Sequence, residues 1–381
     1  MAESLYGRPT RSFIDHDALR WNLHQVRARV GARVKILSMV KANGYGHGAA
    51  PTAKTLAGAG SDAFGVATLE EGVELRQAGI KQPILVLAGA YLDQLDQFLN
   101  HQLMPVVHDI QRMKDLDAAV LGRGAALDAH LKIDTGMGRL GFRATDVELW
   151  IDALKTLRGL KLKGVFSHFS QAESVEGEYT KQQLKSFNGI LKRLCAERIA
   201  PPLAHFANSA ATITLPAAYF DMVRPGIMLY GVYPSAAMAQ QIDLKPALSW
   251  KTEILQLKRV PTGTKISYGQ TFVTKRESLI ATLPIGYADG YARSLSNRGA
   301  ALVRGQRASV AGRVCMDLTM IDVTDIGGVQ QGDEVVLLGR QDTAVISADE
   351  MAAWSNTISY EILTSIGTRV PRVYYHTKED E

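Results

Sequence analysis

The sequence has little cysteine and no long apolar run. Its two cysteines, Cys195 and Cys315, lie far apart in unlike contexts, which argues against a disulfide framework and against a zinc site. Nowhere do about 18 apolar residues follow one another, as a membrane helix requires. The first 21 residues lack the apolar core of a signal peptide. These absences predict a cytoplasmic protein with reduced thiols and no membrane partner.

Charge of one sign is not concentrated anywhere in the sequence. The 43 basic and 38 acidic residues are mixed along the chain and give a net charge of +5. No basic block or stripe is present that could follow a phosphate backbone, so nucleic acid is not an expected partner. With 46% hydrophobic residues, the 381-residue chain is ordinary for a globular protein but longer than one core usually supports. We therefore expect two domains.

From about residue 34, short apolar runs alternate with helical patterns, which is typical of βα units around a parallel sheet. Two apolar stripes at helical spacing lie within 147–157 and 184–194 and predict amphipathic helices. Eight runs are candidate strands, and eight is the number that closes a (β/α)8 barrel. The runs are 34–40, 63–67, 84–88, 104–107, 127–133, 164–169, 203–206 and 222–223.

After Tyr233-Pro234 the sequence changes to short strand-like runs separated by Gly and Pro, as in an all-β domain. These runs are 250–257, 278–283, 308–310, 319–323 and 334–338. We expect an α/β fold with an N-terminal (β/α)8 barrel over 1–240, followed by a C-terminal mainly-β domain over 241–381. The first ~12 residues are expected to pack on the second domain, and the polar tail 376–381 is expected to fray.

Reactive side chains follow several of the predicted barrel strands, at the end where barrel active sites form. They are Lys41 after the first strand, Arg139 after the fifth, His168 at the sixth, His205, Asn208 and Ser209 at the seventh, and Arg224 at the eighth. A lysine after an apolar strand is costly to bury as a cation. It resolves that cost through a lowered pKa, an ion pair or an imine with a carbonyl compound, unless it is simply exposed on the barrel rim.

The segment 40–48 (VKANGYGHG) resembles the pyridoxal-phosphate attachment motif of alanine racemases, a family whose fold is a (β/α)8 barrel followed by a β-rich domain. The common motif has Ala where this chain has Gly44, a change that adds backbone freedom. The resemblance runs nearly end to end, in the family's order. It includes KIDTGMGRLG (132–141), VRPGI (223–227), ISYGQTF (266–272), PIGYADG (284–290), CMD (315–317) and SYEI (359–362).

The resemblance implies that Lys41 binds the cofactor, pyridoxal 5'-phosphate, and serves as one acid/base group at Cα of alanine. Tyr268 is then the second acid/base group and comes from the partner subunit of a homodimer with shared active sites. Racemisation requires two such groups on opposite faces of Cα. A phenol with an ordinary pKa of about 10 needs nearby cations to act near neutral pH, and His168 and Arg139 are the candidates. The alternative for Tyr268 is a buried core tyrosine.

The resemblance also implies which residues surround the cofactor. Arg224 faces the pyridine nitrogen, and its guanidinium can donate a hydrogen bond but does not give up its proton. His205 either orients Arg224 or is a satisfied histidine of the barrel. His168 and Asn208 lie beside the cofactor. The groups expected to grip the phosphate are Tyr45, Ser209, Tyr360 and the backbone N–H groups of Gly226 and Ile227.

Further residues are assigned to the substrate in the same way. The substrate carboxylate is expected to meet Arg139 and the backbone N–H of Met316, the latter from the partner subunit. Tyr287 lines the entrance and limits the size of the substrate side chain. Asp317 is either a gate partner or a structural hydrogen-bonding residue. Lys132 is either carbamylated to N-carboxylysine, which would hold Arg139, or unmodified and ion-paired. No metal is expected.

The implied function is the interconversion of L-alanine and D-alanine, supplying D-alanine for peptidoglycan. A broad-specificity or serine racemase of the same fold remains an alternative. A basic amino-acid decarboxylase would typically have an acidic group where this chain has Arg224. A non-catalytic pyridoxal-phosphate-binding protein would not need Tyr268 or the residues after the barrel, and a Schiff-base aldolase usually takes its lysine from a later strand.

Overall fold

The computed structural model describes residues 7–172 and 177–377, and its internal contacts divide the chain into two units. One, here called the barrel unit, comprises Ala18–Gly44 and Ala49–Lys245; the other, here called the β unit, comprises Met1–Asp17, Tyr45–Gly48 and Pro246–Glu381. Half of the N-terminal segment and most of the polar tail for which we stated expectations lie outside the described residues.

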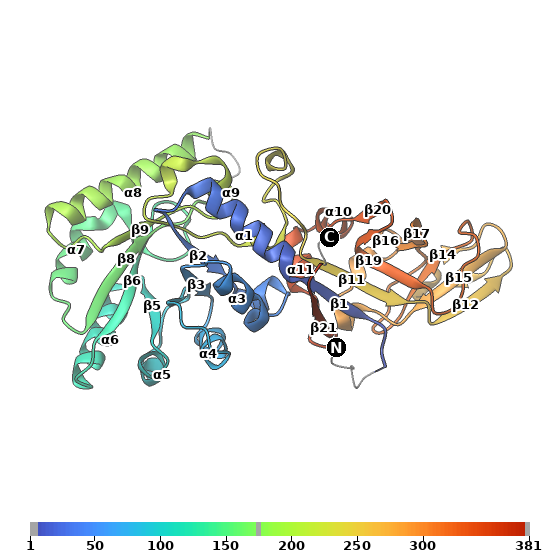
Figure 1. Cartoon of the computed structure of the whole chain (residues 1–381), viewed down its shortest axis with the longest axis horizontal. Helices are drawn as coiled ribbons and strands as arrows, with labels where there is room; N and C mark the ends of the chain where they lie inside the picture. The colour runs from blue at the N-terminus through green and yellow to red at the C-terminus, as the bar shows by residue number, and fades with distance from the viewer. Residues whose placement is uncertain (1–6, 173–176, 378–381) are drawn as a thin grey trace. The chain divides into compact units, whose positions relative to one another are not determined.

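The barrel unit contains a closed parallel barrel, which confirms the predicted (β/α)8 fold (Figure 1). The sheet closes because β2 pairs with both β3 and β10, and β5 pairs with β6. The eight strands are short and mostly buried, as expected of strands covered on both faces. They are β2 (Lys35–Met39), β3 (Ala63–Val66), β4 (Ile84–Val86), β5 (Leu103–Val107), β6 (Leu127–Asp134), β8 (Leu160–Phe166), β9 (Leu203–His205) and β10 (Met222–Val223). A further short strand, β7 (Phe142–Arg143), pairs with β6.

Helices lie outside these strands (Figure 1). The stripe predicted within 147–157 is buried in the structure at Trp150, Ile151 and Leu154. One helix begins at a capping box, in which Thr68 and Glu71 satisfy each other's backbone N–H groups. The helices are α1 (His16–Val30), α2 (Lys41–Tyr45), α3 (Ala49–Gly58), α4 (Leu69–Gln77), α5 (Leu95–Asn100), α6 (Ile110–Gly122), α7 (Val147–Lys155), α8 (Glu178–Ala196) and α9 (Ser209–Thr214).

The β unit is built on one large sheet with the strand order β12-β15-β18-β17-β16-β19-β11-β1-β21. The N-terminal strand β1 pairs antiparallel with β11 and parallel with β21. The strands are β1 (Arg11–Asp15), β11 (Leu248–Glu253), β12 (Gln256–Val260), β15 (Ser278–Leu283), β16 (Ala300–Val303), β17 (Gln306–Val310), β18 (Thr319–Asp322), β19 (Glu334–Gln341) and β21 (Arg372–Tyr375), with β20 (Ala344–Ile346) on β19, the small pair β13 (Lys265–Ile266) and β14 (Phe272–Val273), and the helices α10 (Ala348–Ser355) and α11 (Ser359–Thr364).

One predicted strand of this unit is wrong. The run 250–257 is not a single strand, because β11 ends at Glu253 and β12 begins at Gln256. β11 pairs with β19, whereas β12 pairs with β15. The chain changes partner at Ile254 and Leu255, whose N–H groups bond to Asp333 and Thr282. Two apolar residues at the break continue the sequence pattern, so the pattern hides the change.

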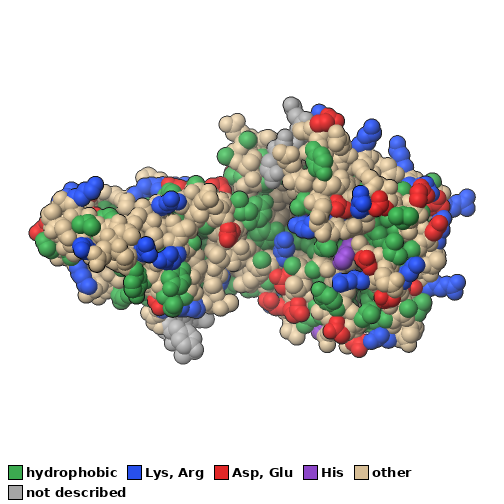
Figure 2. Space-filling view, turned by 180° about the vertical axis from the view of Figure 1, so that it is seen from behind, with side chains coloured by type: hydrophobic (Ala, Val, Ile, Leu, Met, Phe, Trp, Pro, Cys, Tyr) green, Lys and Arg blue, Asp and Glu red, His purple; other side chains and the backbone are tan. Residues whose placement is uncertain are grey.

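Basic and acidic side chains are interspersed on the face seen in Figure 2. Among the residues that the structure describes, no helix is long and apolar enough to cross a membrane.

Candidate active site

Lys41 lies two residues after the end of strand β2 and opens an unusual turn. From Ala42 to Tyr45 the φ angles lie between 50° and 61°, in the left-handed region. The N–H of Gly44 donates to the carbonyl of Val40, which closes this turn. A glycine adopts the left-handed conformation without strain. Gly44, where this chain departs from the common attachment motif, therefore stands at a position that suits glycine.

The amine of Lys41 is half-buried, and its pKa is lowered. Burial is the largest cause, the cation of Arg139 adds to it, and the carboxylate of Glu71 partly opposes it. Glu71 is itself held in place, since its carboxylate accepts from the N–H groups of Ala42 and Ala67 at 2.6 and 2.7 Å. The surroundings thus favour the neutral amine, which is the form that reacts with a carbonyl compound.

Arg224, directly after β10, is almost fully buried. It donates to His205 Nδ1 at 2.9 Å and to the carbonyls of Ser167 and Phe206 at 2.6 and 3.0 Å. Burial lowers the pKa of Arg224 to about 9, which still leaves the guanidinium protonated near neutral pH. No carboxylate among the described residues pairs with it, so its charge is balanced by neutral acceptors.

The hydrogen bonds of Arg224 continue into the barrel through a second histidine that the sequence analysis missed. His205 Nε2 lies 2.9 Å from Nδ1 of His130, a residue of β6. Because a guanidinium only donates, His205 must accept at Nδ1 and donate from Nε2, and His130 must then accept at Nδ1. Burial, followed by the charge of Arg224, lowers the pKa of His130 to about 3 and that of His205 well below 6.5. Both rings are therefore neutral.

The alternation of side chains along a strand could have identified His130 from the sequence. It stands two residues before Lys132, so both side chains point to the same face of β6. The neighbouring strand makes room for its ring at Gly164, where an added Cβ would lie 2.4 Å from the imidazole.

Phe166 is the second residue that the sequence analysis missed. Its ring stacks on His205 with centroids 4.7 Å apart, and Lys132 Nζ lies 4.5 Å from its centroid. Lys132 is 7% exposed. Its pKa falls well below 10.5 because of burial first and the charges of Arg224 and Arg139 next, with Asp134 opposing them. Lys132 forms no ion pair with a described residue.

His168 and Arg139 were expected to supply positive charge. The pKa of His168 lies well below 6.5, since burial and then Arg224 disfavour its protonated form. His168 is therefore uncharged near neutral pH, so only Arg139 of these two residues supplies positive charge. Arg139 is exposed and has no ion-pair partner among the described residues.

The other barrel residues assigned to the cofactor are held by local bonds. Asn208 caps helix α9 by accepting from the N–H of Ala211. The hydroxyl of Ser209 accepts from the N–H of Gly226 at 2.8 Å, and Ile227 begins the short helix that follows. Ser209 and Gly226 are thus side by side.

The remaining assigned residues belong to the β unit. The rings of Tyr45 and Tyr360 lie 6.1 Å apart, and burial, with Tyr360 next, raises the pKa of Tyr45. Tyr268 is the first residue of a short helical turn, and its two neighbours, Ser267 and Gly269, both have positive φ. The side chain of Tyr268 is 71% exposed. Ser267 donates to the carbonyl of Arg313 at 2.6 Å. This bond anchors the turn that presents Tyr268.

Tyr287 and Met316 lie on two neighbouring loops of the β unit, because the N–H of Tyr287 donates to the carbonyl of Cys315 at 3.0 Å. Both side chains are exposed, by 41% and 53%. Asp317 pairs with Arg369 at 2.8 Å. In the β unit the structure thus brings Tyr45 close to Tyr360, and Tyr287 close to the segment that contains Met316.

Comparison with known proteins agrees with this arrangement. Two family models match the chain, "Alanine racemase, N-terminal domain" over residues 14–234 and "Alanine racemase, C-terminal domain" over residues 247–374. The chain is 48% identical over 367 residues to an alanine racemase of Halothermothrix orenii, which covers 96% of this chain and 97% of that protein.

Solved structures are similar to this protein over nearly the whole chain. The alanine racemase of Bacillus anthracis with bound L-Ala-P is 36% identical and superposes with a TM-score of 0.93, covering 99% of this chain and 97% of that one. The alanine racemase of D-cycloserine-producing Streptomyces lavendulae is also 36% identical, with a TM-score of 0.92 and 98% coverage of both chains.

Proposed function

The chain belongs to the alanine racemase family, and we propose that it interconverts L-alanine and D-alanine with pyridoxal 5'-phosphate as cofactor. One observation carries the proposal. Four basic residues, Lys41, Lys132, Arg139 and Arg224, lie in barrel strands, within two residues of a strand end or in the loop that follows β6, and none forms an ion pair with a described residue. An anionic ligand would complete this cluster.

The residues fit pyridoxal 5'-phosphate. Its phosphate and the carboxylate of an amino-acid substrate supply the negative charge that the cluster lacks, and its aldehyde suits the lowered pKa of Lys41. Ser209, Gly226, Ile227, Tyr45 and Tyr360 would hold the phosphate, with Asn208 and His168 beside the cofactor. When bound, pyridoxal phosphate supplies the conjugated ring that delocalises electrons released from Cα.

Lys41 and Tyr268 would perform the proton transfers. The neutral amine of Lys41 can take a proton from one face of Cα while the phenol of Tyr268 returns one at the other face. In the opposite direction the phenolate of Tyr268 takes the proton and the Lys41 ammonium returns one. Arg224 would donate to the pyridine nitrogen and keep its own proton, which limits side reactions. His205 and His130 would fix the orientation of Arg224 through their neutral tautomers.

We propose a homodimer in which Tyr268 and Met316 serve the active site of the partner subunit. The exposure of both side chains in a single chain supports this. Arg139 and the N–H of Met316 would bind the substrate carboxylate, and Tyr287 would limit the side chain. D-alanine would serve peptidoglycan synthesis.

Lys132 is proposed to carry a carbamate. Its buried amine has a lowered pKa and no anionic partner among the described residues, and such an amine can attack CO2. A C–N bond would form, the displaced proton would pass to solvent, and the resulting anion would lie with Arg139 and Arg224. The mass of the intact protein, measured with and without bicarbonate, reports the adduct.

The test of the function is a comparison of wild type, Lys41→Ala and Tyr268→Phe. We expect Lys41→Ala to lose the visible absorbance of the lysine-bound cofactor. Tyr268→Phe should keep that absorbance and lose racemisation by at least about a hundredfold, as expected for one missing acid/base group. Racemisation of L-alanine and L-serine is measured side by side.

Two other outcomes would contradict the proposal, one in its substrate and one as a whole. Wild type with cofactor but faster turnover of L-serine than of L-alanine would replace the substrate assignment. Wild type without cofactor absorbance would contradict the proposal itself.

A further inference from the structure

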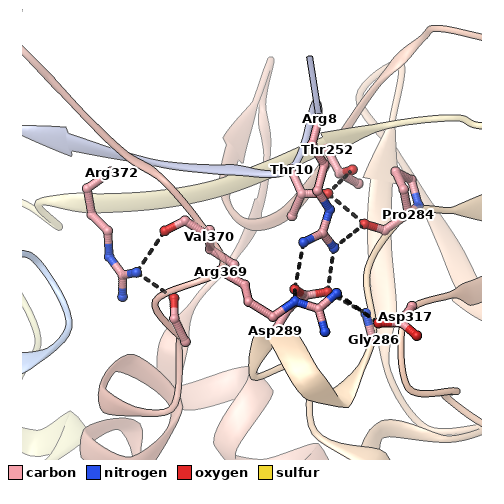
Figure 3. A network of polar contacts seen from close by, with 11 residues as sticks. Arg8, Thr10, Thr252, Pro284, Gly286, Asp289, Asp317, Arg369, Val370 and Arg372 are labelled. Atoms are coloured by element: carbon pink, nitrogen blue, oxygen red, sulfur yellow. Dashed lines mark hydrogen bonds and ion pairs between the residues drawn. The ribbon is translucent and has the colours of Figure 1, made fainter. Parts of the chain in front are cut away.

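The carboxylate of Asp289 is completely buried in the β unit and receives contacts from two arginines (Figure 3). Arg8 binds it with both terminal nitrogens, at 2.7 Å to Oδ1 and 2.5 Å to Oδ2. Arg369 Nε lies 3.4 Å from Oδ1. Oδ2 also accepts from the N–H of Gly286 at 3.1 Å. Every oxygen of this carboxylate is therefore bonded to two groups.

These contacts fix the loop 284–290. Arg8 donates to the carbonyl of Pro284 at 2.7 Å, which holds the start of the loop, while Asp289 holds its end. Gly286 lies against a second segment so closely that an added Cβ would be 2.3 Å from the carbonyl oxygens of Cys315 and Met316. The N–H groups after Gly286, those of Tyr287 and Ala288, donate to these same two carbonyls at 3.0 Å each.

The hydrogen bond from the N–H of Tyr287 to the carbonyl of Cys315 determines the direction in which the N–H of Met316 points. The carbonyl of Cys315 and the N–H of Met316 belong to one planar trans peptide, so they point in opposite directions. Holding that carbonyl against the loop turns the N–H of Met316 away from it. No residue that the structure describes accepts a hydrogen bond from this N–H.

A second contact anchors the same segment. Arg369, which contacts Asp289, reaches Asp317 with its terminal nitrogen at 2.8 Å. Cys315 closes the segment by donating from its N–H to the carbonyl of Leu318 at 2.9 Å. The segment 315–317 is thus held by the loop at the carbonyls of Cys315 and Met316 and by Arg369 at Asp317, and Asp289 contacts both the loop and Arg369.

We propose that Asp289, with Arg8 and Arg369, is a positioning residue that orients the Cys315–Met316 peptide so that its N–H is ready to bind a substrate carboxylate. The inference rests on the proposed function, which assigns the carboxylate to this N–H. A merely structural role would alter stability but leave carboxylate binding unchanged.

The test uses the holoenzyme and the variant Arg369→Ala, with Arg307→Ala as the matched control. Both arginines belong to the β unit and form ion pairs, and their side chains are 47% and 46% exposed. Four quantities are measured: the rate of hydrogen exchange of the Tyr287 and Ala288 amides, KM and kcat for L-alanine, and the calorimetric Kd of propionate, which carries the carboxylate without the amine.

In Arg369→Ala, we expect the amide exchange rate, KM and the propionate Kd each to rise about tenfold, because the hydrogen bond from the Met316 N–H to the charged carboxylate is weakened. The value of kcat should stay within about threefold of that of the wild type. Arg8→Lys, which replaces two parallel bonds by one, should shift all three in the same direction by a smaller factor. Arg307→Ala should shift none.

The proposal is overturned if KM and the propionate Kd stay unchanged in Arg369→Ala, or if Arg307→Ala shifts them equally. Loss of alanine turnover in the wild type would refute the proposed function instead. Propionate binding and amide exchange would still decide the positioning role in that case.

Discussion

In the barrel unit Arg224 is buried without a carboxylate, whereas in the β unit Asp289 is buried against two arginines. The barrel offsets its charge with carbonyls and with two neutral histidines. The β unit pairs its buried charge directly, through the chain's own side chains. A buried ion with its counter-ion supplied by the chain holds structure in place, while a buried ion without one indicates where an outside ligand of opposite charge is needed.

The largest expected effect comes from a variant that breaks the buried ion pairs of Asp289. Asp289→Asn leaves Arg8 and Arg369 without their carboxylate, and removing one partner of a buried ion pair costs about 3 kcal/mol of unfolding free energy. The measurement is chemical denaturation. Asp333→Asn, which breaks the surface pair with Arg304, is the control and should cost less than about 1 kcal/mol. Equal losses of unfolding free energy in the two variants would mean that burial does not increase the cost of removing the Asp289 carboxylate.

A smaller effect tests how the barrel holds Arg224 without an ion pair. Gly164→Ala would drive a methyl group into the His130 ring, and such overpacking costs about 2 kcal/mol. In the background His130→Ala the same change should cost less than about 0.5 kcal/mol, because the ring is gone. Denaturation of the four proteins of this cycle measures the coupling. Additive costs would show that Gly164 and His130 do not depend on each other.

The smallest effect concerns Lys132. Its folded pKa is lowered from 10.5, so unfolding takes up a proton at pH values between the folded and the unfolded pKa. The free energy of unfolding of the apoenzyme should therefore rise with pH in that window, by at most about 1.4 kcal/mol per pH unit from this group. Lys132→Met should reduce the slope. A slope unchanged by Lys132→Met would contradict the lowered pKa.

Much of the barrel could be predicted from the sequence because each strand is a separate buried apolar run. The residues after those runs then pointed to the active site, and the family motifs supplied their roles. His130 and Phe166 were missed because a buried aromatic ring in a strand has the same sequence pattern whether or not it contacts active-site residues. Their contacts with residues on other strands appear only when the barrel closes.

The β unit was less predictable for a related reason. The break after Glu253 lies within an uninterrupted strand-like run, and only the change of partner strand marks it. The contacts of Asp289 join residues from the start, the middle and the end of the β unit's sequence. No local pattern around Asp289 distinguishes it from an ordinary turn residue.

Strand β1 has a consequence for how the chain is made. Its partners β11 and β21 are encoded after the whole barrel unit, and β21 comes near the end of the chain. On the ribosome, β1 emerges before the barrel unit and has no neighbour until β11 follows that unit, and its second neighbour, β21, comes later still. The barrel can fold during translation, but the sheet of the β unit can be completed only after β21 has emerged. Until β11 emerges, the nascent chain carries an unpaired strand, which makes this interval the one most exposed to misassembly.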